Sequence, residues 1–325
     1  MNPAFSVIFL TTLIGAAQGL FLALMAGQIY SDLGVIVEPL EKSFYITGAI
    51  IVTLLMVLGL LASFFHLGRP ERAWRSATKW KTSWLSREVI VLPAFAGMAA
   101  LWGALHYLDI NPIVFVPFDT IQIRLTMVIG LMASGLAMLL FLCTGMIYAA
   151  VKFIQEWASP LTVANYTLLG FASGFTLAGA LASWLELESF EFYVNWAILL
   201  TIVAFIMRMI SLYRNAHIKL KSSPQTAIGI RHPKIVQTSQ GAMGGSFNTR
   251  EFFHHQTDAV VKVIKWFFII GTFIVPVALM AFGLMQSSAG LFIAAIAVQY
   301  LGLLAERWYF FAQARHPQNI YYNAT

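Results

Sequence analysis

Eight long apolar runs constrain this chain more than any other feature of its sequence. They lie near residues 5–29, 44–65, 88–107, 125–147, 162–184, 194–213, 263–285 and 289–311. A helix needs about 20 apolar residues to cross the roughly 30 Å hydrocarbon core of a bilayer, and each run meets that length. The runs are continuously apolar, whereas the strands of a membrane barrel alternate apolar and polar residues. The sequence therefore predicts an all-α integral membrane protein, a single domain over residues 1–325 with eight transmembrane helices.

Composition excludes an ordinary soluble protein, because only 10% of the residues are charged and 59% are hydrophobic. We expect membrane lipids among its partners, and no nucleic acid. The one cysteine, Cys143, has no partner for a disulfide and cannot hold an iron–sulfur cluster, so any such cluster belongs to another subunit. Met1-Asn2-Pro3 leads into the first run without the basic segment of a signal peptide, so we expect that helix to be retained.

Charge is distributed very unequally between the two sides of the predicted helices. With an even number of spans, 18 of the 20 basic residues fall on the side of the termini, and only Lys42 and Arg124 fall opposite. The opposite side carries the acids Asp32, Glu38, Glu41, Asp109, Asp119, Glu186, Glu188 and Glu191. The positive-inside rule makes the basic side cytoplasmic. The chain is therefore predicted to be a multi-pass protein of a bacterial inner membrane with both termini in the cytoplasm.

The cytoplasmic loop over residues 66–87 carries six basic residues and three tryptophans. Gly68 can end the second helix, and Pro70 can begin a short helix on which Arg72, Arg75 and Lys79 share one face. That helix should lie at the membrane interface. It could bind anionic lipid headgroups or dock a soluble partner, and composition leaves both interpretations open.

A histidine and an acid flank this loop and predict quinone chemistry. His66 follows the second span, and Glu88, with Ser86 as an expected N-cap, begins the third. A quinone needs a donor for its carbonyl oxygen and a group that passes a proton, and this pair supplies both. The alternative is that Glu88 is simply favoured by the helix macrodipole.

Three further residues are assigned to the same quinone site, namely Arg69, Trp74 and Arg307. Arg307 closes the last span beside Glu306, and it could hold Glu88 ionised or orient a quinone carbonyl. A salt link between Glu306 and Arg307 near the helix end is the alternative.

Other chemistry is not expected on this chain. A b-type haem needs axial histidines that share a pocket, but His66 and His106 lie at opposite ends of their spans and the other five lie in loops or the tail. We predict no haem, molybdenum, iron–sulfur cluster or metal site, with a pairing of His66 to His254 or His255 as the one exception in view. No ionisable residue sits at mid-membrane, so we predict no proton path across the chain.

Three polar or proline residues within the spans carry structural predictions. Gln18 is expected to form an interhelical hydrogen bond, and Pro93 and Pro276 are expected to kink their helices. The long loop over residues 214–262 is predicted to contain a helix that begins at Asn248, with Glu251 completing a capping-box-like pair.

Two motifs of the second loop resemble a known family. The run His66-Leu67-Gly68-Arg69-Pro70 and the run Leu85-Ser86-Arg87-Glu88 resemble the hallmark of the dimethyl sulfoxide reductase anchor-subunit family. The resemblance implies an eight-helix anchor for a molybdopterin catalytic subunit and a ferredoxin-like iron–sulfur subunit, the latter in direct contact. It also implies electron exchange with ubiquinone or menaquinone at His66 and Glu88. Gly302-Leu303 departs from a Gly-Glu pair that is frequent in the family's closing helix.

Orientation selects a branch of this family. The opening residues 2–12 and the cytoplasmic basic face look more like the anchors of cytoplasm-facing sulfite dehydrogenases, which implies oxidation of sulfite to sulfate on a partner and reduction of quinone here. A reductase of the dimethyl sulfoxide or polysulfide type, which oxidises quinol, is the alternative within the family. A purely structural anchor or a transporter is the alternative from another class. A transporter usually needs a mid-membrane site on broken helices, which the sequence lacks.

Overall fold

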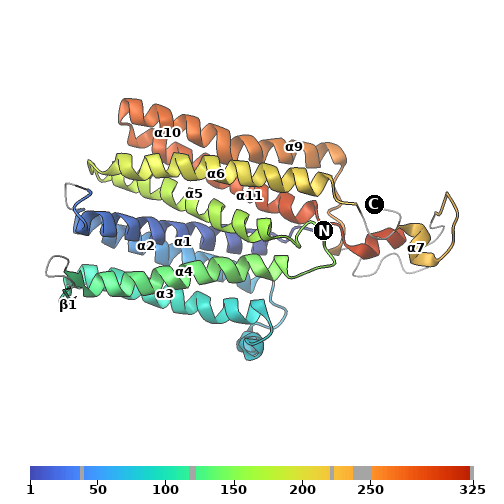
Figure 1. Cartoon of the computed structure of the whole chain (residues 1–325), viewed down its shortest axis with the longest axis horizontal. Coiled ribbons are helices and arrows are strands. Elements are labelled where there is room, and N and C mark those ends of the chain that lie inside the picture. Colours follow the sequence, from blue (N-terminus) through green and yellow to red (C-terminus); the bar gives the residue numbers. More distant parts are fainter. Residues whose placement is uncertain (37–39, 117–121, 220–222, 237–250, 323–325) are drawn as a thin grey trace.

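The computed structural model describes residues 1–36, 40–116, 122–219, 223–236 and 251–322. Within them, eight helical segments are long and apolar enough to cross a membrane, as predicted. Figure 1 shows them packed side by side. They are α1 (Phe5–Asp32), α2 (Lys42–Phe64), α3 (Trp84–Leu108), α4 (Leu125–Ala149), α5 (Pro160–Trp184), α6 (Phe190–Ala216), the segment Asp258–Gln286 and α11 (Ala289–Ala312).

The seventh span is interrupted where the sequence places a proline. It consists of α9 (Asp258–Ile269), the π-helical segment η3 (Ile270–Ile274) and α10 (Val275–Gln286), with Pro276 in the first turn of α10. Pro276 has no N–H to donate to the carbonyl of Thr272, four residues earlier. Gln299 of α11 donates its Nε2–H to that carbonyl at 3.4 Å instead. A π-helical segment therefore precedes Pro276, and a neighbouring helix binds the carbonyl that the proline leaves without a donor, whereas α3 continues as an α-helix through Pro93. The kinks expected at the two prolines stay predictions.

The centre of the bundle is formed by α1 and α5. In their most apolar stretches 61% and 67% of the residues are buried, against 33–44% for the other spans. The two helices touch backbone to backbone, because a Cβ atom on Gly19 would lie 1.9 Å from the carbonyl oxygen of Gly170. A Cβ atom on Gly174 would lie 2.0 Å from the carbonyl carbon of Gly19. Glycine is required at this crossing, as in other close helix contacts within membranes.

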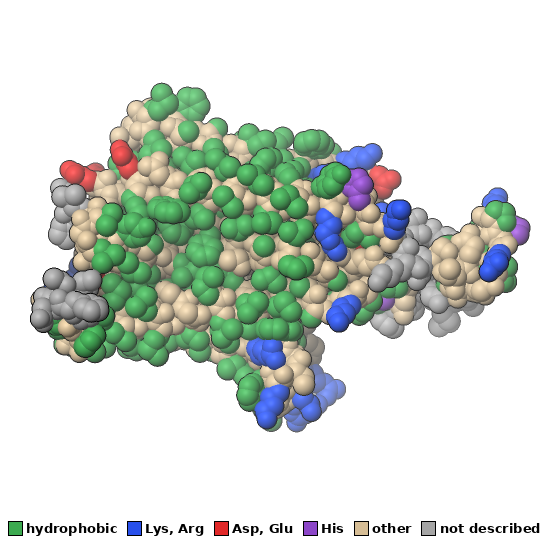
Figure 2. Space-filling view, viewed as in Figure 1, with side chains coloured by type: hydrophobic (Ala, Val, Ile, Leu, Met, Phe, Trp, Pro, Cys, Tyr) green, Lys and Arg blue, Asp and Glu red, His purple; other side chains and the backbone are tan. Residues whose placement is uncertain are grey.

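The two ends of the bundle differ in charge, as the sequence predicted. Figure 2 shows the Lys and Arg side chains gathered at the end that carries the N-terminus, with some acidic atoms among them, and Asp and Glu side chains at the other end. At the acidic end Lys42 forms an ion pair with Asp109 at 3.3 Å. Glu38, Asp119, Lys221 and Arg250 lie outside the described residues. Which end faces the cytoplasm stays a prediction from the positive-inside rule.

Short elements occupy the connections. At the acidic end β1 (Ile113–Phe115) pairs with β2 (Ile123–Arg124) in an antiparallel ladder. At the basic end lie the 3-10 helices η1 (Pro70–Lys79) and η4 (Pro317–Tyr322) and the short helix α7 (Pro224–Ile228). Pro70 begins η1 as predicted, whereas α2 already ends at Phe64, before Gly68. The capping pair expected from Asn248 lies outside the described residues.

Candidate functional site

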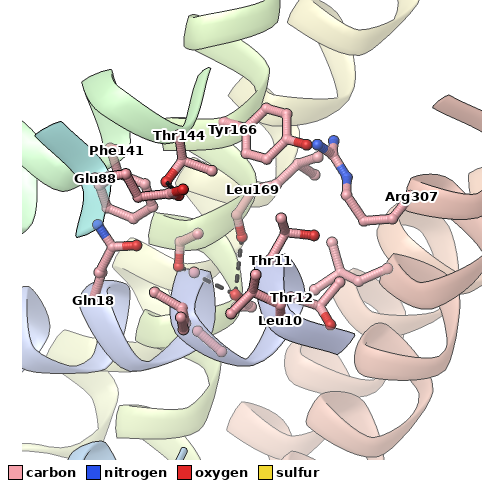
Figure 3. A pocket seen from close by; sticks show the side chains of 16 residues that line it. Leu10, Thr11, Thr12, Gln18, Glu88, Phe141, Thr144, Tyr166, Leu169 and Arg307 are labelled. Carbon is pink, nitrogen blue, oxygen red and sulfur yellow. Dashed lines mark hydrogen bonds between the residues drawn. The ribbon is translucent and has the colours of Figure 1, made fainter. Parts of the chain in front are cut away.

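A cavity lies inside the basic end of the bundle, between α1, α3, α4, α5 and α11. Its polar lining residues are Thr11, Thr12, Gln18, Glu88, Thr144, Tyr166, Ser173 and Arg307. Figure 3 shows Glu88 and Thr144 at one side of it and Tyr166 with Arg307 at the other. The cavity offers about 30 Å³ of room, enough for one or two water molecules. Two residues that the sequence assigned to a quinone site, Glu88 and Arg307, therefore share one cavity.

Glu88 reaches this cavity because α3 begins earlier than predicted. The N-cap is Ser83, whose hydroxyl accepts a hydrogen bond from the N–H of Ser86 at 3.3 Å, so the expected cap at Ser86 is wrong. Glu88 therefore lies beyond the first turn, and its carboxylate faces α4. There the hydroxyl of Thr144 donates to Glu88 Oε1 at 2.5 Å. This hydrogen bond fixes one carboxylate oxygen.

Gln18 joins α1 to α4 at the edge of the same cavity. Its Nε2–H donates to the carbonyl oxygen of Ala137 at 2.7 Å, which confirms the predicted interhelical hydrogen bond. Its amide oxygen points toward the cavity in Figure 3. Gln18 thus has both a structural contact and an acceptor at the cavity wall.

Arg307 belongs to a buried group of three charges. Its Nε–H donates to Glu306 Oε2 at 2.5 Å, and Glu306 Oε1 lies 2.8 Å from Nε of Arg208 on α6. The three side chains are at most 5% exposed. The salt link between neighbours on α11, which was the alternative interpretation of the sequence, is therefore present, and it extends to a second arginine. The sequence had placed Arg208 with the charges flanking the sixth loop, although it lies two turns inside α6 and is buried.

The guanidinium of Arg307 also faces the aromatic ring of Tyr166, with its carbon 4.0 Å from the ring centroid. The Nη1 atom of Arg307 is buried and has no hydrogen-bond partner within the described part of the chain. A buried guanidinium N–H without an acceptor costs free energy. An acceptor oxygen in the cavity would remove that cost.

The cavity combines two chemical capabilities. Glu88 can take or give a proton, and Arg307 can donate hydrogen bonds to a carbonyl or an oxyanion. The two arginines carry one charge more than Glu306 balances, so the positive group faces an ionisable carboxyl across a water-poor space, where electrostatic interactions are strong. A small polar molecule that accepts hydrogen bonds and exchanges protons fits this lining.

The other predicted site residues lie elsewhere. His66, Arg69 and Trp74 are exposed, and none of them lines the cavity. The chain turns outward after α2 ends at Phe64, whereas Glu88 points inward from α3, so the expected meeting of His66 with Glu88 is absent. Partial desolvation lowers the pKa of His66 below its ordinary value of 6.5.

Sequence reasoning missed Thr144, Tyr166 and Arg208. Thr144 is one polar residue in an apolar run, Tyr166 follows the basic-side loop, and an arginine inside an apolar run is unusual. Only Arg208 carried a signal that could have been used. Among the described residues no three His, Cys, Asp or Glu gather as a metal site. The expected absence of haem stays a prediction.

Residues 1–233 match the family model described as DMSO reductase anchor subunit (DmsC). The chain belongs to this family. The matched region covers α1 to α6 and includes Glu88 and Gln18. The chain is also 48% identical over 324 residues to a sulfite dehydrogenase subunit of Allochromatium vinosum, covering 100% of this chain and 99% of that protein. This second match extends over α11 and therefore over Arg307. The chain is thus a multi-pass membrane anchor subunit, and family membership makes it part of a larger oxidoreductase complex.

Proposed function

We propose that this chain is the quinone-reactive anchor of a molybdopterin oxidoreductase of the bacterial inner membrane. It passes electrons between a ferredoxin-like iron–sulfur subunit and the quinone pool, and the molybdopterin subunit is bound beyond that partner. The observation that carries the proposal is the cavity in which Glu88 and Arg307 face each other. Membership of the anchor-subunit family supports the presence of the larger oxidoreductase complex.

Each cavity residue has a defined task in this proposal. Arg307 donates a guanidinium N–H to one carbonyl oxygen of the quinone head. Glu88 exchanges the proton that accompanies reduction, and Thr144 orients its carboxylate. Conversion of the quinone to quinol would take two electrons from the partner's clusters and two protons, which Glu88 would pass one after the other from the cytoplasm. His66, outside the cavity, exchanges protons with the cytoplasm and does not bind the quinone.

The head of a quinone is larger than the space of about 30 Å³ that the cavity offers. Binding therefore requires side chains to move. Leu10 and Thr11 of α1 are half-buried at the cavity wall and can change rotamer, whereas Tyr166 and Arg307 are held by their neighbours. We expect α1 to supply the opening.

The iron–sulfur partner is proposed to dock on the basic end, over the connection 150–159 between α4 and α5. Lys152 and Phe153 are exposed there. Beneath them Trp157 belongs to a buried aromatic cluster with Tyr166 and Phe310, and Tyr166 lines the cavity. A cluster held over this connection would be separated from the quinone by packed aromatic side chains rather than by lipid.

Sulfite is the proposed substrate of the catalytic partner, and quinone reduction the direction, because of the likeness to the sulfite dehydrogenase subunit. The quinone is ubiquinone or menaquinone. A dimethyl sulfoxide or polysulfide reductase, in which the same residues would serve quinol oxidation, is the second candidate, and the family match supports it.

The test compares Glu88→Gln with Glu191→Gln, which removes an exposed acid at the other end of the bundle. In the purified complex, Glu88→Gln should lower quinone-linked sulfite oxidation by roughly a hundredfold or more, the usual contribution of a proton-transferring group. Dye-linked oxidation and the subunit composition of the complex should stay unchanged, and Glu191→Gln should change neither activity.

His66→Ala should slow only the quinone-linked rate. Equal quinone-linked rates for Glu88→Gln and the unmodified complex would identify a structural anchor, and purification of the chain alone would favour a transporter.

A further inference from the structure

The segment 69–81, here called the basic arm, lies beside the bundle at its basic end. In Figure 1 η1 is seen end-on below α3, while the spans run across the picture. The arm therefore runs across the direction of the spans and projects sideways from them. A helix in this arrangement lies along a membrane surface rather than above it. We propose that the basic arm is a binding surface for anionic phospholipid headgroups, a role that does not depend on the quinone site.

Most basic side chains of the arm have no acidic partner within the described part of the chain. The arm carries Arg69, Arg72, Arg75, Lys79 and Lys81. Within the described residues the one ion pair on the arm joins Arg72 to Glu71 at 3.8 Å, and both side chains are at least half exposed. The other four basic side chains have no carboxylate within ion-pair distance in the same described ranges. Phosphate groups of a lipid surface would supply the missing negative charge.

The aromatic residues of the arm fit the same partner. Trp74 and Trp80 are 67% and 54% exposed. The guanidinium of Arg75 lies 5.6 Å from the ring centroid of Trp74, and the ammonium of Lys81 lies 5.7 Å from that of Trp80. Tryptophan concentrates at membrane interfaces because its ring is largely apolar and its N–H is polar. When each ring packs against the apolar part of the lipid, the cation beside it therefore lies at the level of the headgroups.

The arm is held rigidly at one end and meets apolar surface at the other. Arg87 of α3 donates to the carbonyl oxygens of Trp80 and Lys81 at 2.9 and 2.8 Å. At the opposite end Phe65, which is 87% exposed, lines an apolar groove of about 620 Å³ between α1, α2 and α11. An acyl chain can fill that groove while its headgroup lies at the level of the arm.

A protein partner fits the arm less well than lipid does. A soluble subunit docked on the end face of the bundle would leave exposed tryptophans at the side of the bundle in contact with water. A lipid surface covers the rings and the charges at once. The lateral position of the arm therefore decides between the two partners that its composition allows.

The experiment places the full chain in nanodiscs of phosphatidylcholine, with or without phosphatidylglycerol. A polarity-sensitive fluorophore on Thr78→Cys reports on the arm, because the native Cys143 is buried. We expect a blue shift that is larger with phosphatidylglycerol and that decreases as salt is raised. In native mass spectrometry Arg72→Glu with Arg75→Glu should lower the retention of phosphatidylglycerol by roughly 25-fold or more, since each of the two basic residues near a lipid surface contributes about fivefold. The control is Arg231→Glu with Lys234→Glu, the same charge change in an exposed loop at the same end.

Retention that falls equally for both charge reversals would overturn the proposal, because it would reflect net charge alone. The proposal would also be overturned if the emission wavelength of the fluorophore did not depend on lipid composition but shifted when the iron–sulfur subunit was added. That result would identify the arm as a surface that docks a protein.

Discussion

Arg208 of α6 and Glu306 of α11 form an ion pair of 2.8 Å inside the bundle, with side chains 1% and 0% exposed. Glu306 also holds Arg307, whose guanidinium lines the cavity. The position of the cavity's positive charge thus depends on a helix that does not line the cavity. Two charges buried together are costly to separate, because the remaining one is left without a partner or water.

Glu306→Gln should lower the free energy of unfolding by roughly 3–5 kcal/mol, the usual cost of removing one partner from a buried ion pair, because Arg208 and Arg307 would both stay buried without a carboxylate. Thermal unfolding of the detergent-solubilised complex measures this. Lys262→Gln, at an exposed position on α9, is the control and should change stability by less than about 0.5 kcal/mol. Equal stability of the two variants would show that the pair contributes little.

Gly19→Ala should separate α1 from α5, because the new Cβ atom would lie 1.9 Å from the carbonyl oxygen of Gly170. Overpacking of this kind costs roughly 1–3 kcal/mol, and here it also displaces a cavity wall. Gly135→Ala is the matched control on α4, where nothing lies within 4 Å of the added atom, so this variant should be neutral or more stable. Melting temperatures and quinone-linked rates report both effects. Full activity and stability of Gly19→Ala would contradict the close crossing.

Thr144→Val should lower the quinone-linked rate by roughly tenfold or more, because Glu88 loses a hydrogen bond to a charged group. Thr144→Ser keeps the hydroxyl and should retain most of the rate. Single-turnover measurement of quinone reduction separates this effect from docking of the partner. A valine variant as fast as the unmodified complex would show that this hydrogen bond does not contribute to the rate, and a serine variant as slow as the valine variant would show that the hydroxyl alone is not sufficient.

The packing of the C-terminal tail on residues 251–257 should weaken as the pH falls below 6.5. His316 stacks on Phe252 at 3.8 Å between ring centroids, and desolvation lowers the pKa of His316 below 6.5. The packed form of the tail therefore binds a proton on His316 less readily than the released form. The free energy that favours the packed form is fully present above pH 6.5 and is lost as the pH falls through the lowered pKa. His254 shifts in the same direction for the same first cause and adds to the effect.

Hydrogen exchange of residues 313–319 between pH 5 and 8 tests this. Faster opening at low pH is expected, after correction for the intrinsic pH dependence of exchange. His316→Phe keeps the stacked ring and cannot be protonated, so its corrected profile should be flatter. A variant profile identical to that of the unmodified chain would exclude His316 as the titrating group.

The sequence predicted the eight spans and the charge asymmetry, because length, hydropathy and charge act locally. Glu88 and Arg307 were assigned to one quinone site from motifs far apart in the sequence, and the structure brings them to one cavity. The placement of His66 at that site was not reproduced, because nothing local fixes the direction in which the chain leaves α2. The pair of Arg208 with Glu306 joins residues 98 positions apart, and only tertiary packing creates it.

The proposed quinone site lies at the basic end of the bundle, between Glu88 and Arg307. A cryo-electron microscopy structure of the whole complex with bound quinone tests it most directly. We expect the quinone head in the cavity, with one carbonyl oxygen within hydrogen-bond distance of Arg307 and the other side of the ring facing Glu88. A head bound at the acidic end of the bundle, near Lys42 and Asp109, would contradict it.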